Sequence, residues 1–166
     1  DLQQWYAAHP SAAYVTPDEA RTLASYDLVL LCATDDQAEQ ADIDAHEHTL
    51  QRTLALLSHV CAGGSTSRVM MVTRGALSPE ANAGTPSTHE HSMARCMARA
   101  LAGAMRSARI EHPAGNMVVL DVDPRHDVCE AVQSELATTD GELEVTYGAE
   151  GVRKVRRYEQ VSVTSS

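Results

Sequence analysis

Three apolar runs of strand length alternate with longer segments, and this alternation constrains the fold more than any other feature. The runs cover about residues 27–33, 68–74 and 117–122. Continuous apolar runs are typical of strands buried on both faces of a parallel sheet, because helices cover both faces of such sheets. We therefore predict an α/β fold with a largely parallel, doubly wound sheet and right-handed crossovers.

Three other segments have the periodicity of amphipathic helices, at about residues 38–61, 89–110 and 125–137. In the first, apolar side chains recur at three- and four-residue steps and form a stripe that we expect to be buried: Ile43, Leu50, Leu54, Leu57 and Cys61. Two shorter strands, at 143–147 and 152–158, are predicted to close the chain as a hairpin, because a glycine-containing turn separates them.

The opening residues and the cysteines indicate the compartment. Residues 1–5 lack the basic start and apolar core of a signal peptide. Residues 16–19 have the pattern of a helix start, with a threonine N-cap followed by proline. The chain does not begin with methionine, so we expect a piece excised from a longer protein. The four cysteines have no metal-knuckle spacing, and we expect reduced structural thiols and a cytoplasmic location: Cys32, Cys61, Cys96 and Cys129.

Charge and hydropathy exclude two kinds of partner. The formal net charge is −10, so we expect no nucleic-acid surface, which would need a basic stripe. The single lysine, Lys154, lies in the basic run 153–157, whose alternation favours an exposed strand face over a polyanion site. The chain has no apolar run of the roughly 18 residues that a membrane span requires, so we expect no membrane partner.

The residues of a dinucleotide site are missing from the expected positions. After the first strand, where a glycine triplet would let the backbone approach a pyrophosphate, the chain has residues 33–36, Ala-Thr-Asp-Asp. Two acids there would repel a phosphate. A single glycine, Gly75, follows the second strand, whereas Gly63 and Gly64 precede a strand. We therefore expect no cofactor-binding residue in this chain.

The residues of other active sites are missing as well. Short-chain reductases use a tyrosine that is followed four residues on by lysine or asparagine, and none of the five tyrosines fits: Tyr6, Tyr14, Tyr26, Tyr147 and Tyr158. The sequence contains no GxSxG and no HExxH motif. In the clusters 46–48 and 89–91, both His-Glu-His, the histidines stand two apart and point to different sides of a helix. We expect no catalytic and no metal-binding residue.

Three motifs give the chain a family resemblance. Residues 72–76 are Val-Thr-Arg-Gly-Ala at a strand end, residues 111–113 are Glu-His-Pro at a helix end, and residues 118–123 are Val-Val-Leu-Asp-Val-Asp. In this order they resemble the N-terminal structural subdomain of the ketoreductase in modular type I polyketide synthases, from about residue 26 to 158. Ala102 stands where that family has tryptophan, and Met105 replaces a glycine.

The resemblance implies that residues 1–166 form one truncated Rossmann-like subdomain, without its opening residues, that braces a catalytic subdomain further along the polypeptide. NADPH and the reduction of β-ketoacyl thioesters on an acyl carrier protein would belong to that subdomain, and neighbouring synthase domains would be further partners. The chain alone would be non-catalytic. Three alternatives remain open: the scaffold of a reductively silent pseudo-ketoreductase, a self-standing small α/β hydrolase or metal-binding protein, and a protein-binding module.

Overall fold

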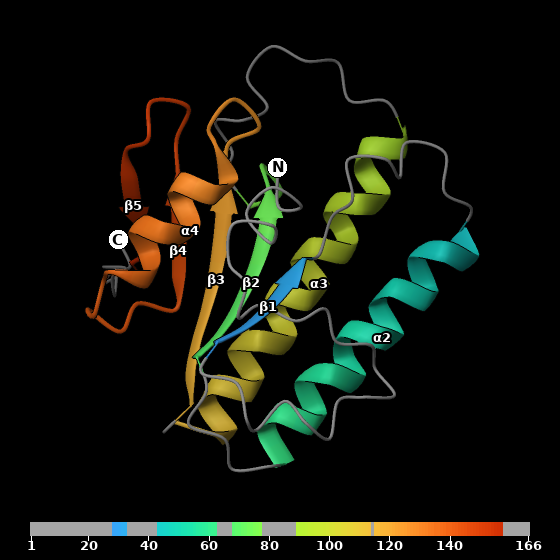
Figure 1. Cartoon of the computed structure of the whole chain (residues 1–166). Helices are drawn as coiled ribbons and strands as arrows, with labels where there is room; N and C mark the ends of the chain where they lie inside the picture. The colour runs from blue at the N-terminus through green and yellow to red at the C-terminus, as the bar shows by residue number, and fades with distance from the viewer. Residues whose placement is uncertain (1–27, 33–42, 63–67, 78–88, 114, 158–166) are drawn as a thin grey trace, which may run out of the picture.

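A computed structural model describes residues 28–32, 43–62, 68–77, 89–113 and 115–157. The expected helix start at 16–19, the acidic turn at 33–36 and Gly63 and Gly64 lie outside these ranges. Within them, the chain forms a five-stranded sheet with three helices (Figure 1). The architecture confirms the predicted truncated Rossmann-like α/β fold.

The strands follow one another across the sheet in chain order, β1-β2-β3-β4-β5. Their bounds are β1 Leu28–Cys32, β2 Arg68–Arg74, β3 Asn116–Val122, β4 Glu144–Tyr147 and β5 Arg153–Val155. The first four strands are parallel, and β5 pairs antiparallel with β4. The three predicted strands and the predicted hairpin are therefore confirmed.

The helices are α2, Ile43–Ala62, α3, His89–Glu111, and α4, Val128–Leu136. The prediction placed the start of α4 three residues too early. The helix begins at Val128 because the Asp127 side chain caps it and accepts a 2.9 Å hydrogen bond from the Glu130 amide. None of the described helices is long and apolar enough to cross a membrane.

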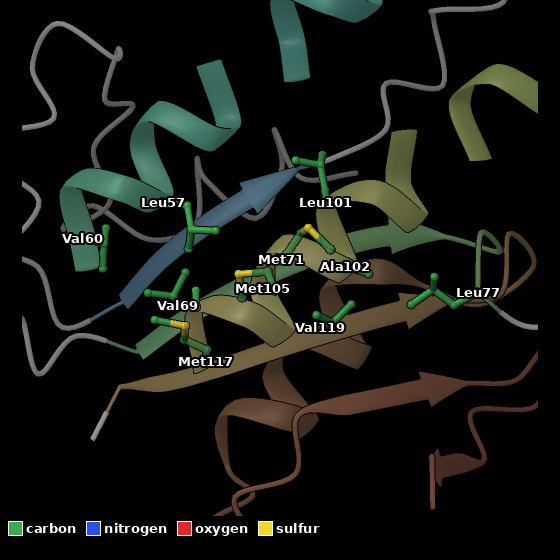
Figure 2. Close-up of a cluster of buried hydrophobic side chains, with 11 residues drawn as sticks. Leu57, Val60, Val69, Met71, Leu77, Leu101, Ala102, Met105, Met117 and Val119 are labelled. Atoms are coloured by element: carbon green, nitrogen blue, oxygen red, sulfur yellow. The ribbon is translucent and has the colours of Figure 1, made fainter. Parts of the chain in front are cut away.

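Alternate side chains of β2 and β3 point into two separate cores. Val69 and Met71 pack against α2 and α3, and Figure 2 shows Met71 beside Leu101 and Met105 of α3. Met70 and Val72 of β2 share the core of α4 with three residues of β3: Val118, Leu120 and Val122. Because both strands are buried on both faces, their inner residues, 69–72 and 117–120, are continuously apolar.

One crossover differs from the expectation. All three helical connections advance in the same direction across the sheet, yet α4 lies on the face opposite α2 and α3. The β3-α4-β4 connection therefore has the opposite hand to the other two, and the prediction of uniformly right-handed crossovers is wrong. The α2 and α3 side of β3 is already covered by α3, so α4 packs on the other side.

The buried stripe of α2 also differs from the prediction. Leu54 was expected in the core and is 37% exposed, whereas Thr53, Leu57 and Val60 are buried. At about 100° per residue, Leu54 lies about 40° beyond Leu50 on one side of the helix, while Thr53 and Val60 lie on the other side. The helix packs against α3, and this second side is the one that is buried in the shared core, so this packing selects Thr53 and Val60.

The two residues that depart from the family motif lie on the buried face of α3. Ala102 and Met105 are 0% and 1% exposed and belong to the same cluster of side chains. Figure 2 shows both on the side of α3 that faces the sheet. They are three residues apart and hence neighbours on the helix surface. The long methionine therefore supplies bulk next to the small alanine.

Candidate functional site

The edge formed by the carboxyl ends of the parallel strands is the place where open α/β sheets bind ligands. Besides the hairpin turn at residues 148–152, the structure describes two connections at this edge, residues 75–77 after β2 and residues 123–127 after β3. Both contain residues of the motifs that carry the family resemblance. We therefore treat this edge as the candidate functional site.

The turn after β2 closes around a buried carboxylate. Asp121 is 1% exposed and accepts hydrogen bonds from the Thr73 hydroxyl at 2.6 Å, the Ala76 amide at 2.9 Å and the Leu77 amide at 3.0 Å. Gly75 allows the turn because its φ is 60°, in the region that side chains disfavour. The backbone amides that follow the strand are thus directed at the protein's own carboxylate.

The carbonyl groups of the same turn accept hydrogen bonds from arginine side chains of α3. Gly75 O accepts from Arg95 Nη2 at 3.5 Å, and Ala76 O accepts from Arg99 Nε at 3.2 Å. Arg95 and Arg99 are one turn apart on α3, so the helix presents both guanidinium groups to this loop. In the turn of the Val-Thr-Arg-Gly-Ala motif, the amides therefore donate to Asp121 and the carbonyl groups accept from arginines of α3.

The connection after β3 has a second internal carboxylate. Asp123 accepts 2.9 Å hydrogen bonds from the backbone amide, Nε and Nη2 of Arg125. The hydrogen bond from the Arg125 side chain is the main cause that lowers the pKa of Asp123 to about 2. Arg74 spans the two connections by donating to Pro124 O at 2.6 Å. Both acidic side chains that end β3 thus have partners within the described chain.

A buried ion-pair network that sequence reasoning missed lies beneath α4. Glu135 is 1% exposed and accepts from Arg153 Nε at 2.8 Å and Nη2 at 3.2 Å. Arg68 lies 3.5 Å away, and the Tyr147 hydroxyl donates a 3.5 Å bond. The ion pair with Glu135 raises the pKa of Arg153, and burial raises the pKa of Tyr147. The sequence signal that could have revealed this network is an acidic residue, Glu135, on the apolar face of the helix predicted at about residues 125–137.

Tyr147 has a second packing role. Its ring stacks on the His126 imidazole, with ring centroids 5.9 Å apart and planes 2° from parallel. Gly151 also lies beside the imidazole, and a Cβ there would stand 3.1 Å from the His126 Cε1 atom. Tyr147 of the hairpin therefore contacts the connection before α4 with its ring and α4 itself with its hydroxyl. The other four tyrosines lie outside the described residues.

The basic run 153–157 was predicted to be an exposed strand face. Lys154 is exposed as expected, whereas the Arg153 side chain is only 25% exposed, because its guanidinium reaches Glu135 under α4. Arg156 lies 3.1 Å from Glu144, and Arg157 donates to Glu142 at 2.6 Å. The three arginines of this run are thus paired with carboxylates of the same chain.

The histidine clusters and cysteines are only partly described. In the first cluster, Glu47 and His48 are exposed, and the second cluster, residues 89–91, forms the start of α3. Cys61 and Cys96 are free thiols, as is Cys129, and burial raises the pKa of Cys61. Across the part of the chain that the structure covers, no three histidine, cysteine or acidic side chains are grouped to hold a metal ion.

Fold and edge together define a Rossmann-like α/β domain in which the amides after β2 bind an internal carboxylate. The chain matches the family described as polyketide synthase extender module SpnB, Rossmann fold domain, over residues 3–154, and it belongs to this family. The match confirms the resemblance to the structural subdomain of polyketide synthase ketoreductases. No curated protein matches the chain.

Proposed function

We propose that this chain is the structural scaffold subdomain of an NADPH-dependent β-ketoacyl reductase in a polyketide synthase. In this role it braces a catalytic subdomain of the same polypeptide, which binds NADPH and reduces β-ketoacyl thioesters on an acyl carrier protein. The chain itself holds neither cofactor nor catalytic residue, and it acts in the cytoplasm. Its membership in a polyketide synthase Rossmann-domain family supports the proposal.

The observation that carries the proposal is the turn closed by Asp121. A phosphate at the end of a strand binds to free backbone amides, often at a helix N-terminus. Here the amides of Ala76 and Leu77 donate to the Asp121 carboxylate. A phosphate at this turn would have to displace Asp121 and approach its charge. Such a turn suits a domain that supports a neighbour better than one that binds a dinucleotide.

The cofactor part of the proposal is tested by titrating NADPH into residues 1–166 and measuring heat by calorimetry. We expect no saturable signal, because the strand ends offer no glycine triplet and no free described amide at this turn. An NADPH-dependent reductase under the same conditions serves as the positive control. Micromolar affinity of residues 1–166 for NADPH would contradict the proposal.

The bracing part is tested by expressing residues 1–166 and the following segment of the parent polypeptide separately and then mixing them. We expect co-elution, a higher melting temperature for each partner and restored reduction of a β-ketoacyl thioester. Co-elution without reduction would identify the pseudo-ketoreductase alternative. If the following segment reduces at full rate alone and mixing changes neither melting curve, the bracing role is wrong.

A further inference from the structure

We draw no further inference here: the strongest candidate, the outward face of α3 that carries Cys96, Ala100, Ser107 and the 80% exposed Ile110, is an unpartnered helix face, and nothing in the structure shows what covers it.

Discussion

Thr73 and Asp121 are directly opposite each other in the pairing of β2 with β3, and the threonine hydroxyl donates a 2.6 Å hydrogen bond to the aspartate. The same carboxylate accepts from the amides of Ala76 and Leu77. One side chain of β3 therefore holds the end of β2 and the turn that follows it. This relationship joins the Val-Thr-Arg-Gly-Ala motif at residues 72–76 to the Val-Val-Leu-Asp-Val-Asp motif at residues 118–123.

Replacing the carboxylate tests this relationship. In Asp121→Asn, an amide NH₂ group takes the place of one acceptor oxygen and faces a donor of the turn. We expect the free energy of unfolding to fall by about 1–3 kcal/mol, the cost of leaving a buried polar group unsatisfied. Urea denaturation measures the change. Asn116→Ala, at the exposed start of the same strand, is the matched control and should change stability by less than about 0.5 kcal/mol. Equal midpoints for Asp121→Asn and wild type would contradict the assignment.

The backbone conformation of Gly75 leads to a second prediction. Gly75→Ala places a side chain at a φ of 60° and should destabilise the fold by about 1–2 kcal/mol. Gly103→Ala is the contrasting variant, because Gly103 lies within α3 and its Cβ would meet only Arg106 Nη2, at 3.8 Å. A helical alanine there should stabilise by about 0.4–1 kcal/mol. Thermal unfolding of the two variants should therefore shift in opposite directions, and a shift in the same direction would refute the argument.

The face that α2 buries predicts different losses of stability when Leu57 and Leu54 are replaced by alanine. Leu57 is 6% exposed and lies in the core with Val60, so Leu57→Ala should lower the free energy of unfolding by about 2–4 kcal/mol. Leu54 is 37% exposed, and Leu54→Ala should cost less than half as much, because it leaves a smaller cavity. Chemical denaturation of both variants gives the comparison. Equal losses would show that Leu54 is buried as deeply as Leu57, as the sequence pattern suggested.

The ion pair of Asp123 with Arg125 predicts a pH dependence. The pKa of Asp123 is lowered from 3.8 to about 2, mainly by its hydrogen bond from Arg125. Because the folded pKa is below the unfolded one, the carboxylate contributes stability above 3.8, and this contribution is lost as the pH falls from 3.8 through about 2.

Carboxyl-carbon NMR titration checks this value directly. We expect Arg125→Gln to move the pKa of Asp123 back toward 3.8 and to destabilise the fold at neutral pH, with the difference shrinking as the pH approaches 2. Arg52→Gln, at an exposed position of α2, is the charge-matched control and should leave the titration unchanged. An Asp123 pKa near 3.8 in the wild type would exclude the ion pair.

Local patterns predicted the elements better than their contacts. The strand β2 was predicted with the bounds that it has, Arg68–Arg74, because burial on both faces makes its inner residues 69–72 continuously apolar. The start of α4 was misplaced because it depends on the capping bond from Glu130 to Asp127, which the periodicity does not show. Leu54 was misplaced because helical spacing leaves two adjoining stripes possible, and only contact with a neighbour selects one.

At the candidate site, too, the sequence showed which residues are present but not which groups they contact. The sequence showed that the glycine triplet after the first strand and the reductase tyrosine motif are missing, and its motifs indicated the family that the comparison confirmed. It did not show the partners of Asp121 or Glu135. A polar residue within an apolar run is visible in a sequence, whereas the group that satisfies it is not.

By itself, the sequence of this protein determined its strand and helix segments, its α/β class and its family, because burial periodicity and short motifs are local properties. Only the tertiary structure decided the opposite hand of the α4 crossover, the face that α2 presents and the bond between Thr73 and Asp121. The last joins residues 48 apart in the chain. Such contacts depend on strand order and on which sheet face is already covered, and these are set by the packing of the whole domain.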